Sequence, residues 1–242
     1  GNLVYALDAA SGDMLWRYQH DLPDNLIANH RTNRGVALYG DKVYTATLDA
    51  RVVALDAHSG EVVWDTSVQN NSFGYYITMA PLAIDGKIMV GTSGGENGVR
   101  GFIAALDAET GEELWRTYTV PGPGEFGNDS WPGESWRTGG AAVWVSGNYD
   151  PDLGLSYWGT GNPGPWIGDQ RPGDNLYTNS VLALDVKSGA IRAHHQYHWN
   201  GSWDWDEVDT PMLMPVERNG RQINALVHPG RNGYLWTLER KA

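Results

Sequence analysis

The chain contains 242 residues, of which 41% are hydrophobic, and it carries a formal net charge of −12 at pH 7. This charge argues against a nucleic-acid partner, because a phosphate backbone binds surfaces of the opposite sign. No cysteine is present, which excludes disulfide and thiolate chemistry within the chain, and no apolar run is long enough to span a membrane. The 31 glycines and 12 prolines separate short apolar runs, a pattern that favours an all-β fold.

One sequence signature recurs along the chain. It starts with an apolar strand that ends in Ala-Leu-Asp, continues through a Ser-Gly or Thr-Gly turn, and ends on a tryptophan in the next strand. In the last copy Ala193 or His194 stands near the tryptophan position. The first copy begins at the first residues, so we expect the chain to be part of a longer one. The four copies occupy residues 4–16, 53–64, 104–115 and 182–194.

Each copy predicts a strand, a tight turn and a second strand. The Asp side chain is suited to cap the turn, and the glycine supplies the positive φ that such turns require. Trp16, Trp64 and Trp115 are predicted to pack between neighbouring repeats. A fifth strand of similar type is expected at 233–238. A period near 50 residues with about four strands per unit is typical of a β-propeller; a β-sandwich with chance internal similarity is the alternative.

The third and fourth copies are farther apart than the others. Leu106 and Leu184 are 78 residues apart, whereas the two preceding intervals are 48 and 51 residues. The insertion, at about 117–175, is rich in glycine, proline and tryptophan. Long loops on a rigid scaffold usually carry function, so we expect site residues there.

Several residues depart from the repeat and recur about once per unit, so a closed ring would gather them at one end of its axis. Glu96, Asn162, Asp204 and Asp206 are oxygen donors of the kind that hard cations such as calcium or a lanthanide prefer. Other candidates are Arg34 and Arg231, suited to carboxylate or quinone oxygens, and Trp144, a flat platform.

Three histidines, a composition that resembles a zinc site, lie in and just after the fourth copy of the signature. They are His194, His195 and His198. No cysteine or matching histidine lies in register with them, so we interpret these residues as structural or surface histidines.

These segments resemble the large subunit of methanol and ethanol dehydrogenases that depend on pyrroloquinoline quinone (PQQ). The resemblance covers essentially the whole chain and implies an eight-bladed quinoprotein β-propeller, of which about half is present, with domain bounds 1–242. It implies that Asp204 is the catalytic base. The implied cofactor-binding residues are Arg34, Thr78, Ser93, Gly94, Gly95, Trp144 and Arg231. The implied metal ligands are Glu96, Asn162, Asp204 and Asp206.

Asp206, the second carboxylate of the Trp-Asp-Trp-Asp stretch, indicates which metal ion the site prefers. In the resembling family, an Asp two residues after the catalytic Asp is typical of lanthanide enzymes, whereas calcium enzymes commonly carry Ala or Thr there. A trivalent ion gains more from one extra carboxylate than a divalent ion does. Asp206 therefore favours a lanthanide, with calcium as the alternative.

The chain also departs from that family. The family usually carries two adjacent cysteines, in a vicinal disulfide over PQQ, where Ala28 and Asn29 stand here. A threonine common two residues before the platform tryptophan is Ala142. A degenerate enzyme is therefore one alternative.

The resemblance implies a periplasmic alcohol dehydrogenase that oxidises primary alcohols to aldehydes and passes electrons to a cytochrome c. It leaves a homodimer open. An alternative function of a different class is a non-catalytic propeller scaffold of the bacterial envelope. Such scaffolds have similar repeats but do not need the Glu96, Asn162 and Asp204 side chains.

Overall fold

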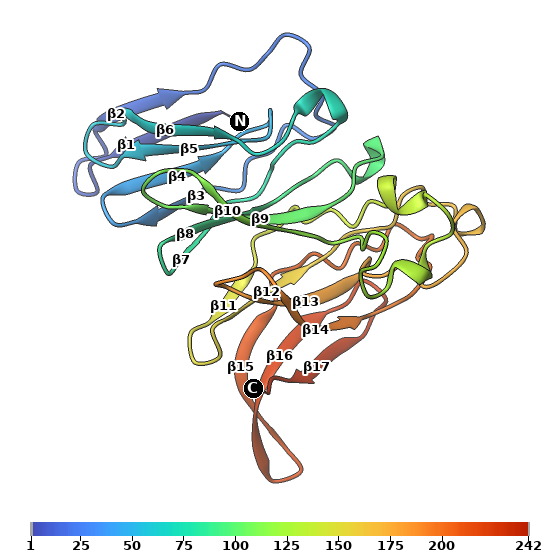
Figure 1. The fold of residues 1–242 in the computed structure, drawn as a ribbon. Coiled ribbons are helices and arrows are strands. Elements are labelled where there is room, and N and C mark those ends of the chain that lie inside the picture. Colours follow the sequence, from blue (N-terminus) through green and yellow to red (C-terminus); the bar gives the residue numbers. More distant parts are fainter. Residues whose placement is uncertain (1, 242) are drawn as a thin grey trace.

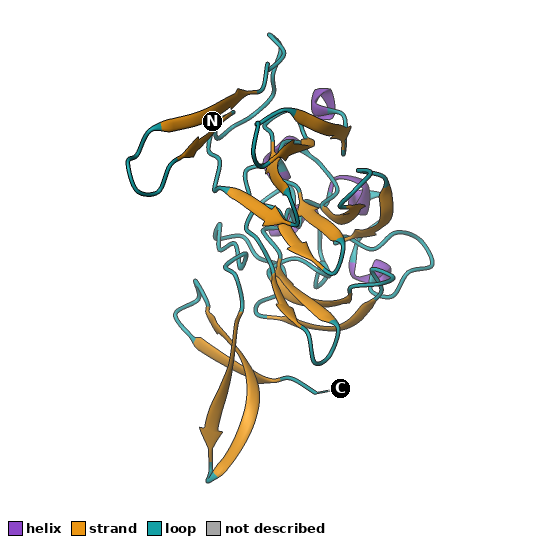
Figure 2. Cartoon of the chain, turned by 90° about the vertical axis from the view of Figure 1, so that its left-hand side faces the viewer, coloured by secondary structure: helices purple, strands orange, loops and turns teal. Residues whose placement is uncertain are grey.

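The structure is a computed structural model that describes residues 2–241. The chain forms five antiparallel sheets, which follow one another in chain order and are arranged as a fan (Figure 1). The first and fifth sheets lie at opposite ends of this fan (Figure 2). None of the helices in the described range has the length and apolar character needed to cross a bilayer.

The first sheet contains β1 (Leu3–Leu7) and β2 (Met14–Gln19). The second contains β3 (Val36–Tyr39), β4 (Lys42–Ala46), β5 (Arg51–Asp56) and β6 (Val62–Ser67). The third contains β7 (Leu82–Ile84), β8 (Lys87–Gly91), β9 (Phe102–Asp107) and β10 (Glu113–Tyr118). The fourth contains β11 (Asn148–Asp150), β12 (Leu155–Gly159), β13 (Ser180–Asp185) and β14 (Ile191–Gln196). The fifth contains β15 (Met212–Arg218), β16 (Arg221–Pro229) and β17 (Leu235–Glu239).

The helices of the described chain are short 3-10 turns in the connections: η1 (Asn71–Phe73), η2 (Gly95–Asn97), η3 (Asn128–Ser130), η4 (Ser135–Thr138) and η5 (Gly168–Gln170). The main core joins the second, third and fourth sheets. Strands β4, β5, β8 and β9 are almost wholly buried within it.

The signature turns are capped by aspartate, as the sequence predicts. Oδ1 of Asp56 accepts the backbone N–H groups of His58 and Ser59, and the N–H of Gly60 donates to the Asp56 carbonyl. These hydrogen bonds lower the pKa of Asp56 from its ordinary value. The same pattern recurs at Asp8, Asp107 and Asp185.

A β-bulge precedes each signature tryptophan. Leu55 pairs with Val62, but Ala54 pairs with Trp64, so one residue of the outer strand is left over. The equivalent shift occurs in the first, third and fourth sheets. In the fourth sheet the partner of Ala183 is Ala193, which therefore occupies the tryptophan position there.

The signature tryptophans join one sheet to the next. Nε1 of Trp64 donates to the carbonyl of Ala108 in the third sheet at 3.0 Å. Its ring covers Gly111 so closely that a Cβ at this glycine would lie 2.7 Å from the ring. The prediction that these tryptophans pack between repeats is thus confirmed. Equivalent contacts are made by Trp16 with Ala57 and Gly60, and by Trp115 with Val186 and Gly189.

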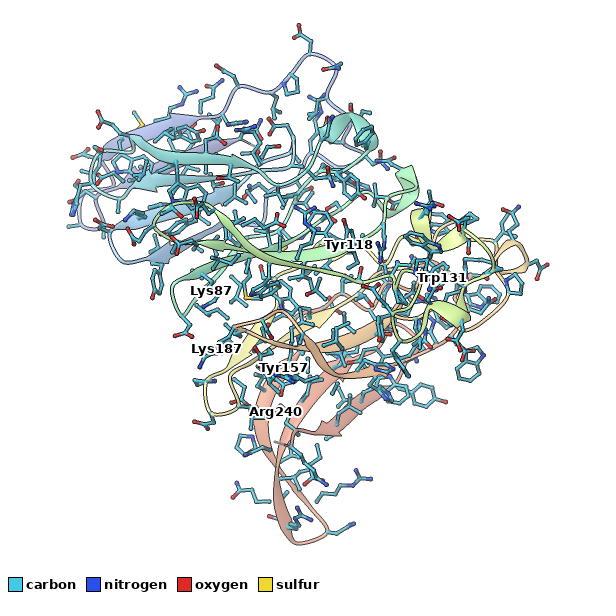
Figure 3. All side chains as sticks on the ribbon, viewed as in Figure 1. Lys87, Tyr118, Trp131, Tyr157, Lys187 and Arg240 are labelled. Atoms are coloured by element: carbon cyan, nitrogen blue, oxygen red, sulfur yellow. The ribbon has the colours of Figure 1, made fainter. Side chains whose placement is uncertain are left out.

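The strand order separates two kinds of connection. In a four-stranded antiparallel sheet, the first and third turns lie at one end, while the middle turn and the crossing to the next sheet lie at the other. Figure 3 shows Lys87 and Lys187, at two of the tight hairpins, on the side opposite Trp131, which lies in a long crossing. Long connections are therefore brought together at one end of the fan.

Contact with Trp64 makes a side chain at Gly111 less tolerable than its left-handed backbone conformation alone would. Gly86 and Gly111 have the same φ of +74°, but a Cβ at Gly86 would meet no atom within 4 Å. We expect Gly86→Ala to lower the free energy of unfolding by about 1 kcal/mol, the cost of a left-handed alanine. Gly111→Ala is expected to cost a further 1–3 kcal/mol or so, because the methyl group overpacks Trp64.

Denaturant unfolding of the two variants of the full natural chain measures this difference. Equal losses of stability in both would contradict the role of the Trp64 contact.

Candidate active site

All eleven predicted site residues line one cavity of about 410 Å³. They come from seven separate stretches of the chain, in the second to fifth sheets and their connections. They are Arg34, Thr78, Ser93, Gly94, Gly95, Glu96, Trp144, Asn162, Asp204, Asp206 and Arg231.

Sheet topology explains why they meet. Ser93–Glu96, Asn162 and Arg231 follow β8, β12 and β16, the second strands of three consecutive sheets. The remaining residues lie in the crossings that lead from one sheet to the next. Both kinds of connection reach the same end of an antiparallel sheet, so the third, fourth and fifth sheets each contribute twice to the cavity.

One part of the cavity is cationic and rich in hydroxyl groups. Nη1 of Arg34 donates to Oγ1 of Thr78 at 2.6 Å, and this hydroxyl lies 3.1 Å from Oγ of Ser93. Thr78 and Ser93 are buried. The Arg34 guanidinium also lies 4.7 Å from the ring centroid of Trp144. Partial burial lowers the pKa of Arg34 from its ordinary value. A guanidinium beside two hydroxyls is suited to bind a carboxylate.

Another part of the cavity is lined by oxygen donors. Nδ2 of Asn162 donates to Oδ1 of Asp204 at 2.7 Å, and its backbone N–H donates to Oδ1 of Asp206 at 2.6 Å. A Cβ at Gly161 would lie 2.6 Å from the same Asp206 oxygen, so only glycine leaves room for that carboxylate. Asp204 has a φ of +58°, in the left-handed region that Asp tolerates better than most residues.

Burial and repulsion by neighbouring carboxylates both disfavour the ionised form of Asp206. Burial, with additional repulsion from Asp204 and Glu96, raises the pKa of Asp206 from 3.8 to about 6. The hydrogen bond from Asn162 and attraction to Arg231 oppose this change without cancelling it. Three carboxylates that repel one another in a partly buried site are an arrangement that a cation stabilises.

The donor chemistry of the cavity fits both groups that the sequence implies. The Arg34, Thr78 and Ser93 side chains suit a carboxylated ligand, and Trp144 offers a flat face to a ring. The oxygen-only donor set suits a hard cation. Within residues 2–241 no three His, Cys, Asp or Glu side chains form a closed cluster, and Asn162 stands between the acidic groups.

The family model for the β-propeller domain of PQQ-dependent glucose, ethanol and alcohol dehydrogenases matches residues 1–242. The chain belongs to this PQQ propeller family. Quinoprotein alcohol dehydrogenase PedH of Pseudomonas putida is 42% identical over 98% of this chain, which corresponds to 43% of that protein. The lanthanide-dependent methanol dehydrogenase of Methylacidiphilum fumariolicum is 35% identical over 99% of this chain and 43% of its own length.

A solved structure agrees with the family assignment. A europium-containing methanol dehydrogenase superposes with a TM-score of 0.93, at 35% identity, over 98% of this chain and 46% of its own. The chain thus spans less than half the length of these relatives. The predicted fold class, an all-β quinoprotein propeller of which about half is present, is confirmed.

Several residues that line the PQQ-family cavity were missed by the sequence analysis. Trp166 belongs to the insertion that was expected to carry function, but its Gly-Pro-Trp context does not distinguish it from other loop tryptophans. The side chain of Tyr76 is buried, so its position in the cavity wall depends on packing. The missed lining residues are His30, Thr32, Tyr76 and Trp166, and the cavity is also lined by Asn29 and Ala142, which the sequence analysis named as departures from the family.

Asn29, at a position where the family usually has a cysteine, faces the cavity. Its Nδ2 donates to Oδ1 of Asn97 at 3.3 Å. The segment is thus tied to the helical turn η2 by a side-chain hydrogen bond.

A buried arginine fixes the loop that carries Trp166. Arg171 is fully buried, and its guanidinium donates to the carbonyls of Pro165, Trp166 and Gly201 and to Oδ1 of Asn175. Burial lowers its pKa to about 10. These bonds join the connection after β12 to the one that leads to Asp204, so Arg171 holds two walls of the cavity together.

The three histidines of the fourth repeat face different surroundings. His194 packs against Phe126 and Tyr177, whereas the neighbouring His195 packs against Tyr197 and Trp236. His198 instead contacts the segment that follows Asp204. These contacts agree with the structural interpretation of the histidines.

The raised pKa of Asp206 has a consequence for stability. The folded protein binds this proton more tightly than the unfolded chain, so the penalty for ionised Asp206 is absent well below pH 3.8 and complete above about pH 6. We expect Asp206→Asn to raise the melting temperature of the metal-free protein near pH 7.5, with a smaller gain as the pH falls toward about 4.

Thermal unfolding at the two pH values checks this, with Asp169→Asn, an exposed carboxylate outside the cavity, as the control. A melting temperature that is unchanged or lower in Asp206→Asn near neutral pH would contradict the raised pKa of Asp206.

Proposed function

We propose that this chain forms the cofactor- and metal-binding part of a quinoprotein alcohol dehydrogenase that oxidises primary alcohols to aldehydes. The observation that carries the proposal is the cavity in which a guanidinium, two buried hydroxyls and a tryptophan accompany three carboxylates and a carboxamide. Relatives named as quinoprotein alcohol dehydrogenase and lanthanide-dependent methanol dehydrogenase support it. The envelope-scaffold alternative has no use for this set of side chains.

The cationic part of the cavity would hold PQQ. Arg34, with Thr78 and Ser93 hydrogen-bonded beside it, would bind a carboxylate of the cofactor. Trp144 would support the ring system. The remaining proposed contacts, along the cofactor edge and at the quinone oxygens, are Gly94, Gly95 and Arg231.

The acidic part would hold the metal ion. Glu96, Asn162, Asp204 and Asp206 supply oxygen ligands only, which suits calcium or a lanthanide. We propose a lanthanide, because the fourth oxygen donor, Asp206, adds a carboxylate whose attraction grows with the charge of the ion.

Asp204 would act as the general base. It is exposed at the cavity, and Asn162 donates to its Oδ1, which fixes the carboxylate and directs Oδ2 to the alcohol hydroxyl proton. When bound, PQQ supplies the oxidant that accepts the hydride and the metal ion supplies a Lewis acid.

The whole protein would act in the periplasm and pass electrons to a cytochrome c. These two assignments, and the homodimer, follow from the family resemblance and stay predictions. The domain bounds 1–242 stay a prediction as well.

Removing the proposed base tests the reaction. Asp204→Asn keeps the shape of the side chain but cannot take the proton, so we expect dye-linked oxidation of a primary alcohol by the full-length protein to fall by roughly 10² or more. Asp209→Asn, which changes an exposed carboxylate outside the cavity, is the matched control. Full activity in Asp204→Asn, with PQQ and metal content unchanged, would exclude the role of this residue.

The metal is tested separately. We expect metal-free protein loaded with PQQ to be activated by lanthanum, and Asp206→Ala to weaken lanthanum-dependent activation roughly tenfold more than activation by calcium. Activation curves for the two ions measure this ratio. Activity with calcium and none with lanthanum in the unchanged protein would refute the lanthanide assignment.

A further inference from the structure

A buried carboxylate–imidazole pair lies behind the cavity, and neither member lines it. Glu207 is 0% and His228 is 1% exposed, and Nε2 of His228 lies 2.6 Å from Oε2 of Glu207. The Tyr197 ring stacks on the His228 ring, with centroids 4.3 Å apart. Nε2 of His198 lies 3.4 Å from Oε1 of Glu207. The carboxylate is therefore enclosed between two imidazoles.

The pair connects two segments that carry site residues. Glu207 directly follows Asp206, and His228 lies in β16, three residues before Arg231. Oε2 of Glu207 also accepts the backbone N–H of Arg231 at 3.3 Å. One carboxylate thus contacts both the last residues of β16 and the connection that begins after it.

The backbone of Glu207 also packs against a third segment of the chain that carries a cavity residue. A Cβ at Gly159, the last residue of β12, would lie 2.3 Å from the Glu207 carbonyl oxygen. Gly159 lies three residues before Asn162. The backbone of Glu207 is therefore packed on the strand that leads to Asn162, while its side chain reaches toward Arg231.

Stability alone gives little reason to bury this carboxylate. A buried ion pair recovers about the desolvation cost of its charges, and well-packed apolar side chains often serve stability as well or better. A carboxylate whose Oε2 accepts from both the His228 ring and the Arg231 backbone N–H fixes orientation in a way that an apolar side chain does not.

We propose that Glu207 and His228 are positioning residues, which hold Asp206, Arg231 and Asn162 in fixed relative places around the cavity. The inference rests on the proposed function, because Asp206 and Asn162 are its proposed metal ligands. Glu207 and His228 themselves touch neither the metal nor the cofactor.

The anchoring is tested in the metal-free, full-length protein by amide hydrogen exchange. Glu207→Gln replaces the carboxylate with a neutral amide, so the hydrogen bonds that Oε2 accepts from His228 and from the Arg231 backbone lose their charged acceptor and weaken. We expect faster exchange at 202–207 and 229–232 in this variant. The control is Asp150→Asn, which removes another buried carboxylate, paired with Arg240 between the fourth and fifth sheets and absent from the cavity wall. It is expected to leave exchange in both segments unchanged.

The effect on the site is measured by titration with Tb³⁺ alone, followed by its tryptophan-sensitised luminescence. Residues that support metal ligands from behind typically contribute 10- to 100-fold to metal affinity, so we expect Glu207→Gln to weaken Tb³⁺ binding by about tenfold or more. Asp150→Asn is expected to bind like the unchanged protein. His228→Gln, which keeps an N–H donor, is expected to retain more affinity than His228→Leu, which leaves Glu207 unpaired.

The outcomes separate the two proposals. Unchanged exchange at both segments in Glu207→Gln, or unchanged Tb³⁺ affinity in both Glu207→Gln and His228→Leu, overturns the positioning role. Absence of Tb³⁺ binding by the unchanged protein overturns the metal site of the proposed function, and hydrogen exchange then decides the anchoring by itself.

Discussion

The packing of a signature tryptophan on a glycine of the next sheet sets the distance between neighbouring sheets, and the position of every cavity residue follows from that distance. The Trp64 indole spans the gap between the second and third sheets, donates to a carbonyl of the third sheet and covers Gly111. Because each contact uses the turn of one sheet and the outer strand of its neighbour, the sheets repeat at a regular interval. Their connections therefore converge instead of scattering over the surface.

The connections that converge at this end of the sheets bring together charged side chains that would not associate by themselves. Asp206 is largely removed from water and is repelled by Asp204 and Glu96, and its raised pKa reflects first this burial and then the repulsion. A site that is costly until a cation binds is a common property of metal-binding proteins, because the scaffold supplies the energy that assembles the ligands. Arg34 and Trp144, on another part of the wall, extend the same cavity toward an anionic, flat ligand.

Two buried ionisable groups support the loops around this cavity. Arg171 joins the insertion after β12 to the segment before Asp204, and Glu207 joins the segment after Asp206 to the end of β16. Both lie next to the site, outside the apolar core between the sheets. Loops have few apolar side chains to bury, so hydrogen bonds to charged groups hold them in one conformation.

The repeat, the aspartate-capped turns around Asp56 and its equivalents, and the tryptophans between sheets could be predicted from the amino-acid sequence, because these features depend on residues close in sequence or on a regular period. Resemblance to a known family identified the residues of the cavity. The three-dimensional fold was needed to show that Ala193, and not His194, holds the fourth tryptophan position, and that Arg171 and Glu207 are buried beneath the loops. The partners that join them to a second loop, Gly201 for Arg171 and His228 and Arg231 for Glu207, lie about 20 to 30 residues away, so no local pattern distinguishes the two residues from the exposed Arg and Glu residues that most sequences contain.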